Sequence, residues 1–276
     1  MEVKLAEIND IIGVCNALVQ RIEKTGTVQT GDDLYEKYKV LINLFCDKYD
    51  IDKNSTKLVH STYLSIKDYY WKRNYTVNLS EAKAILELVI FLKKLLFPDL
   101  YEKIFISHRE KDKRQVDALI ELLYAIGIPR PLQNGEKSIF CTSHPAAYVE
   151  NGQKFDEQIF KQFYSEKNVF FILWYTENYF QSQACLNEMG AIWVMDKKYQ
   201  EILIPGFDRH KIGGLLPKAA ISFYANDKYR LNTLKEQIEK MFYLQPITPN
   251  TWETARDKFI TTIEELVLSE KSEVIP

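Results

Sequence analysis

Apolar residues in the first hundred positions recur at alternating steps of three and four, which places them on one face of a helix. Four such stripes precede Pro98, and they favour a small bundle of about four helices. The stripes cover positions 5–22, 34–45, 59–70 and 85–96. Ser80 is the expected N-cap of the fourth helix, and Pro98 is expected to end it. An intramolecular core explains the stripes, and pairing of one helix with a second copy of the chain is the alternative.

After Pro98 the pattern changes to short apolar runs that alternate with helix-period segments, which is typical of βαβ units and a parallel sheet. Expected strands are 104–106, 138–142, 168–174, 201–207 and 221–224. Helices are expected after Asp112 as N-cap, from Phe155 to Phe163, at 182–195, and around Leu231–Met241 and Trp252–Leu266. Right-handed crossovers then give an α/β domain with a flavodoxin-like, five-stranded parallel sheet.

The predicted organisation is therefore an all-α helical bundle domain at 1–98, a sheet domain at 101–245, and a C-terminal helix and tail at 246–276. A chain of 276 residues is long enough for two domains of ordinary size. Its 46% apolar and 27% charged residues are those of a globular protein.

Charge and cysteine usage narrow the classes of partner and compartment. The formal charge is −2, with 36 basic and 38 acidic side chains, so no nucleic-acid partner is expected. The four cysteines form no CxxC pair, which disfavours a disulfide framework and a zinc site and favours a reducing cytoplasm. The N-terminal residues lack the apolar core of a signal peptide, and charges interrupt the longest apolar runs, so no membrane partner is expected.

Position alone marks the strand ends as candidate ligand-binding segments, because open parallel sheets bind ligands beyond the carboxyl ends of their strands. These segments are 107–109, 142–143 and 174–175. In the helix at 182–195, Glu188 lies about 90° from the centre of the apolar stripe, at its border. An ordinary boundary glutamate is one interpretation, and a partly desolvated carboxylate in a cleft is the other.

Other reactive side chains give weaker signals. The histidines show no metal-ligand spacing, and no metal site is predicted. Cys185 lies on the apolar stripe and is interpreted as a packed thiol. Trp174 and Tyr175 fit a cleft or a core equally well. The absence of GxSxG, Walker A and GxGxxG motifs argues against serine-hydrolase, P-loop and Rossmann proteins.

Three motifs in residues 101–245 resemble the TIR (Toll/interleukin-1 receptor) domain family. They are IFISHR at 104–109 followed by Asp112, NGQKFD at 151–156, and SQACLNE at 182–188. They occur in the family's order and spacing, each on the element that the pattern predicts. The resemblance covers roughly half of the chain and leaves residues 1–98 outside.

Among TIR domains, this sequence is most similar to those that cleave NAD+, in bacterial defence, plant immunity and axon degeneration. The resemblance implies that Glu188 is catalytic and that the reaction releases nicotinamide with ADP-ribose or a cyclic isomer. It further implies that NAD+ is bound as a substrate and not as a cofactor, and that a set of side chains binds it. The resemblance implies His108, Arg109 and Phe155, and the expected set is completed by Trp174 and Ser182. Many active members carry Trp four residues before the glutamate, whereas this chain has Ala184.

The resemblance also implies self-association through the BB loop at 143–153. The apolar stripes of the N-terminal helices offer a second candidate surface for it. A prokaryotic, anti-phage signalling role is the biological setting that it suggests. The competing hypothesis is a non-catalytic TIR interaction module, which would bind partner proteins without cleaving NAD+. The glutamate favours the enzyme, because signalling adaptors of this family usually lack it.

Overall fold

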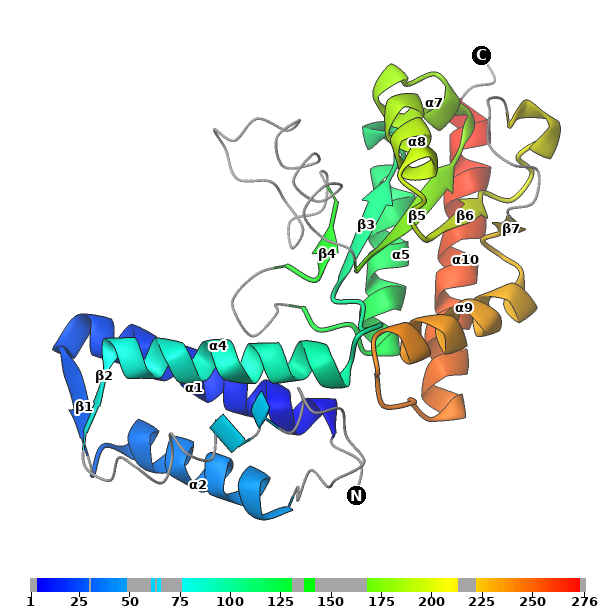
Figure 1. The fold of residues 1–276 in the computed structure, drawn as a ribbon. Coiled ribbons are helices and arrows are strands. Elements are labelled where there is room, and N and C mark those ends of the chain that lie inside the picture. The colour runs from blue at the N-terminus through cyan, green and yellow to red at the C-terminus, as the bar shows by residue number, and fades with distance from the viewer. Residues whose placement is uncertain are drawn as a thin grey trace. The chain divides into compact units, whose positions relative to one another are not determined.

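The computed structural model describes residues 4–29, 31–48, 61–62, 64–65, 76–130, 137–141, 168–212 and 222–273. The chain divides into two compact units with a boundary between Asp99 and Leu100 (Figure 1). The expected helix at 59–70, the expected helix from Phe155 to Phe163, and the loop at 143–153 fall largely or wholly outside the described residues.

The first unit contains helices α1 (Leu5–Thr25), α2 (Asp33–Lys48) and α4 (Leu79–Leu96), and α1 packs against both of the others (Figure 1). It also contains an antiparallel pair, β1 (Thr27–Gln29) and β2 (Thr76–Asn78). The prediction of a purely helical unit is therefore wrong in this respect. Strands of three residues are too short to show a period of two in the sequence.

Helix α4 begins two residues earlier than its sequence suggested. Asn78, not Ser80, is the N-cap, and its side chain accepts a hydrogen bond from the Glu81 amide while the Glu81 carboxylate accepts one from the Asn78 amide. This reciprocal capping box satisfies two amides that the helix leaves without an internal partner. Ser80 lies inside the first turn instead.

The second unit is built on a five-stranded, fully parallel sheet. Its strands are β3 (Lys103–Ser107), β4 (Ile139–Phe140), β5 (Val169–Tyr175), β6 (Tyr199–Leu203) and β7 (Phe223–Tyr224). The spatial order β4-β3-β5-β6-β7 reads 2-1-3-4-5 in chain order, the order of flavodoxin-like sheets. Strand β6 starts and ends earlier than the apolar run at 201–207 indicated.

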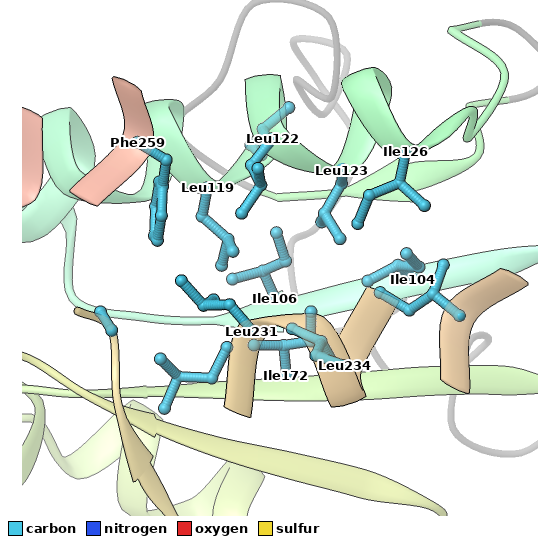
Figure 2. Packing of buried hydrophobic residues seen from close by; sticks show 14 of the residues in the cluster. Ile104, Ile106, Leu119, Leu122, Leu123, Ile126, Ile172, Leu231, Leu234 and Phe259 are labelled. Atoms are coloured by element: carbon cyan, nitrogen blue, oxygen red, sulfur yellow. The ribbon is translucent and has the colours of Figure 1, made fainter. Parts of the chain in front are cut away.

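Helices cover both faces of this sheet, which explains why β5 is buried along its whole length. On one face lie α5 (Lys113–Ile126), α9 (Lys228–Met241) and α10 (Pro249–Glu273). Figure 2 shows Leu119 and Leu123 of α5 packed towards Ile106 of β3, with Leu234 of α9 in the same cluster. Because α10 contributes Phe259 to that cluster, this helix, which makes up most of the predicted C-terminal segment, is part of the core of the second unit.

The opposite face is covered by α7 (Glu177–Phe180) and α8 (Gln183–Val194). Side chains on each strand alternate between the two faces. Ile104 and Ile106 of β3 therefore point to the α5 side, whereas Phe105 packs on the α7–α8 side. This alternation decides which strand-end residues can meet α8.

Asp112 stands at the N-cap position of α5, as expected, but its carboxylate does not cap the helix. It accepts hydrogen bonds from Thr176 Oγ1 and Asn178 Nδ2, both at 2.6 Å, and so joins the end of β3 to the end of β5. At its other end α5 stops at Gly127, whose φ of 116° lies in the left-handed region that favours glycine.

In the described part of the chain, none of the helices combines the length and the apolar character required to cross a membrane.

Candidate functional site

The carboxyl ends of β3 and β5 and the helices α7 and α8 bring a small polar group together on one face of the sheet. Glu188 projects from α8 towards the end of β3, where its Oε2 accepts a hydrogen bond of 2.5 Å from Ser107 Oγ. Ser107 is the last residue of β3 and is buried. The glutamate at the border of the helical stripe therefore faces a strand end and not open solvent.

The half-buried Glu188 carboxyl has an altered acidity. Removal from water raises its pKa from 4.5 to about 7, and the hydrogen bond from Ser107 opposes part of that rise. Burial penalises the charged form of a carboxyl group, whereas a donated hydrogen bond favours it. Glu188 therefore exchanges its proton close to neutral pH, where both the protonated acid and the ionised carboxylate are accessible for catalysis.

Tyr179 of α7 completes the group. Its hydroxyl lies 3.0 Å from Ser107 Oγ and 3.0 Å from the backbone carbonyl oxygen of Cys185. The ring is fully buried, and burial raises the phenol pKa well above its ordinary value of 10. A continuous row of oxygens thus runs from the carboxyl of Glu188 through two hydroxyls to the first turn of α8.

Arg109 and Ser182 meet at the N-terminus of α8. Ser182 is the N-cap, and its Oγ accepts hydrogen bonds from the Cys185 amide at 3.4 Å and from Arg109 Nη1 at 3.3 Å. Arg109 is exposed, so its guanidinium is accessible at this edge of the sheet. The structure therefore joins these two expected substrate-binding residues to the helix that carries Glu188.

His108 turns towards the other side of the strand end. Both ring nitrogens lie 3.7 Å from Cys141 Sγ, and Nδ1 lies 3.4 Å from the carbonyl oxygen of Ile106. Cys141 and Ile106 belong to the cluster that α5 covers. Burial lowers the pKa of His108 below its ordinary value, which favours a neutral imidazole.

Trp174 is separated from Glu188 by the sheet. Its ring is fully buried in the cluster on the α5 side, and its Nε1 donates to Gln115 Oε1 at 2.9 Å. The open question of cleft or core is answered as core for this residue, so Trp174 does not line the Glu188 group. Tyr175, its neighbour, points to the Glu188 side and donates to Glu201 Oε1 at 3.3 Å.

Two further expectations concern the surroundings of Glu188. Phe155 lies outside the described residues, as does the loop at 143–153, and Ala184 is an exposed position on α8. Cys185 is buried, and burial raises its thiol pKa to about 11, which agrees with a packed thiol. Within the described ranges, no three His, Cys, Asp or Glu side chains lie together as metal ligands would.

Sequence reasoning missed Tyr179. The short helix α7 shows no periodic pattern, and a tyrosine four positions beyond the end of β5 carries no local signal. Ser107 had been a candidate only through its place at a strand end. The contact between the buried residues Tyr175 and Glu201 was also missed, because it joins two neighbouring strands and leaves no local signal in the sequence.

Comparison with known proteins gives a relative of similar length. The chain is 34% identical over 166 residues to a protein of Bacillus subtilis (strain 168) named "Uncharacterized protein YddK". The matched stretch covers 60% of this chain and 59% of that protein, so the chain spans less than two thirds of its relative. No family model matches the chain, and no solved structure matches it.

Proposed function

We propose that this chain is a TIR-type NAD+ glycohydrolase that cleaves the bond between nicotinamide and ribose. The observation that carries the proposal is the half-buried carboxyl of Glu188, held by Ser107 at the carboxyl end of a parallel strand. Ligands of open α/β sheets bind at this edge. The resemblance of 104–109, 151–156 and 182–188 to NAD-cleaving TIR domains supplies the substrate class.

The chemistry requires negative charge near the ribose. Cleavage of the C1′–N bond leaves the electron pair on nicotinamide and develops positive charge on the sugar, as in glycoside hydrolysis. Nicotinamide leaves as a neutral molecule, so no general acid is needed for its departure. In its ionised form Glu188 stabilises the sugar cation and accepts hydrogen bonds from ribose hydroxyls.

Arg109 is suited to the diphosphate of the substrate. Its guanidinium presents several N–H donors in a planar fork, which matches the oxygens of a phosphate. The residue is exposed and is held beside the N-terminus of α8 by its hydrogen bond to Ser182. A helix N-terminus adds partial positive charge to the same place.

The attacking group decides the product. If water attacks C1′, its oxygen forms the new bond, one of its protons is released, and the products are nicotinamide and ADP-ribose. If an atom of the same substrate attacks, a cyclic isomer of ADP-ribose forms. Chromatography of the products separates these outcomes.

Replacement of the carboxylate tests the proposal. Glu188→Gln is expected to lower NAD+ turnover by about 10²-fold or more, because the amide has no negative charge to offset the sugar cation. Nicotinamide release is measured with the full chain, and circular dichroism checks that the fold is intact.

Glu177→Gln is the matched control, since Glu177 lies on the neighbouring helix α7, is exposed, and pairs with Lys211 at 2.6 Å. It is expected to turn over NAD+ at the wild-type rate. Equal turnover in the wild type and in Glu188→Gln would remove Glu188 from the mechanism. A wild-type protein that releases no nicotinamide would favour the non-catalytic interaction module.

A further inference from the structure

Three oxygen–oxygen contacts connect Glu188 to the backbone of its own helix. They are Glu188 Oε2 to Ser107 Oγ at 2.5 Å, Ser107 Oγ to Tyr179 Oη at 3.0 Å, and Tyr179 Oη to Cys185 O at 3.0 Å. All three distances are those of hydrogen bonds, and each such bond requires one hydrogen. The number of hydrogens present therefore decides whether the row can be completed.

The ionised form of Glu188 leaves the row one hydrogen short. A carboxylate and a backbone carbonyl only accept, and a serine and a tyrosine supply one O–H each. Two hydrogens cannot fill three contacts. If Ser107 donates to Glu188 and Tyr179 donates to Ser107, the oxygens of Tyr179 and Cys185 face each other without a hydrogen, which is unfavourable in a buried place.

The neutral form of Glu188 completes the row. Its carboxyl proton is donated to Ser107, Ser107 donates to Tyr179, and Tyr179 donates to the carbonyl of Cys185. Each oxygen then has a hydrogen between itself and its neighbour. The Tyr179 hydroxyl, acting through Ser107, thus favours the protonated carboxyl, in the same direction as its removal from water.

The other titratable groups around this row come from each element packed against it. They are Tyr179 on α7, Cys185 on α8, Arg109 and Asp112 after β3, Tyr175 on β5 and Glu201 on β6. The protonation of Glu188 is governed by burial and by Ser107 ahead of all of these. Glu201 is itself buried with a raised pKa, which lessens its charge.

We propose that Tyr179, acting through Ser107, is a positioning residue that holds the resting Glu188 as a neutral acid, and that loss of its proton to solvent converts the site to its cation-stabilising form. The Ser107 hydroxyl by itself supports the ionised carboxylate. For catalysis this rests on the proposed NAD+ cleavage. The statement about the proton does not, because it concerns the protein without substrate. Bond cleavage and proton release are then linked, since the sugar cation that develops during cleavage favours the ionised carboxylate.

Two substitutions are expected to move the protonation midpoint of Glu188 in opposite directions. Tyr179→Phe removes the hydroxyl that makes the ionised form one hydrogen short, so the midpoint falls by about one pH unit. Ser107→Ala removes the donor that supports the carboxylate, so the midpoint rises by a similar amount. Tyr175→Phe is the matched control, because this buried hydroxyl on the same face contacts Glu201 instead.

The midpoint is measured in the full chain without NAD+, from the infrared band of the neutral carboxyl group, and Glu188→Gln assigns the band. A parallel series measures kcat/KM for NAD+ against pH, whose lower inflection is expected to move with the midpoint. Thermal unfolding confirms that each variant is folded. If one of Tyr179→Phe and Ser107→Ala does not fold, the shift of the midpoint in the other variant is sufficient for the test.

Midpoints that shift oppositely in the two variants and stay constant in Tyr175→Phe support the inference. A wild-type midpoint near 4.5, the ordinary value, would overturn it, as would midpoints that neither variant moves. If the midpoints shift as expected and no NAD+ is cleaved, the proton-holding role stands and the proposed enzyme fails. If NAD+ is cleaved with an inflection that neither variant moves, the reverse holds.

Discussion

The raised pKa of Glu188 makes the stability of the protein depend on pH. The carboxyl binds its proton up to about pH 7 when folded and up to about pH 4.5 when unfolded. Between these values the folded state holds more protons, so the free energy of unfolding falls as pH rises. The contribution is fully present below about pH 4.5 and is lost as pH passes through about 7.

Comparison with Glu188→Gln isolates this effect. Relative to the variant, the wild type is expected to lose on the order of 3 kcal/mol of stability between about pH 4.5 and pH 8. Urea unfolding at several pH values measures the difference, in which contributions from Asp112 and Glu201 cancel. A difference that stays constant with pH would show that Glu188 has an ordinary acidity.

At the same scale, the sequence located Glu188 but not its partners. The border position of Glu188 follows from a period of 3.6 residues, which is a local property. The contacts with Ser107 and Tyr179 join residues far apart in the chain. Trp174 could not be assigned to a face, because β5 is apolar on both sides and its sequence therefore lacks the alternation that distinguishes them.

Secondary-structure elements with a strong period were predicted well, and short ones were not. The apolar runs of β3 and β5 and the stripe of α5 appear close to their expected bounds. The strands β1 and β2 and the helix α7 are three or four residues long and carry no periodic signal. Their formation depends on tertiary contacts, which the local pattern does not show.

The N-terminus of α4 provides a test at this scale. Asn78→Ala is expected to destabilise the first unit by about 1 kcal/mol, because the Glu81 amide loses its acceptor. Ser80→Ala is the control and is expected to have little effect, since alanine is favoured inside a helix. Hydrogen exchange of the α4 amides in the full chain measures both. A larger effect at Ser80 would restore the cap that the sequence pattern suggested.

At the scale of the whole molecule, the two units have separate cores. The two clusters that enclose the sheet draw all of their buried members from Ile104 onwards. The residues that we assign to the site, from Ser107 to Glu188, belong to the same unit. The helices before Asp99 therefore add no described side chain to either the sheet core or the proposed chemistry.

A chain that starts at Leu100 should consequently fold on its own. We expect a cooperative thermal transition by circular dichroism and NAD+ cleavage that again depends on Glu188. The full-length chain, measured in parallel, shows what the first unit adds to rate or assembly. Loss of the cooperative transition in the shortened chain would mean that the first unit is required for the fold of the second.

The buried amide of Gln115 has a consequence for the far end of the chain. Its oxygen accepts from the Trp174 indole, and its nitrogen donates to both carboxylate oxygens of Glu270 at 2.9 Å. Glu270 lies in the last turns of α10, where helices ordinarily fray. Unwinding of those turns would leave the buried Gln115 amide nitrogen without its acceptor, beside the central strand β5. The hydrogen bonds from Gln115 therefore oppose fraying at this end of α10.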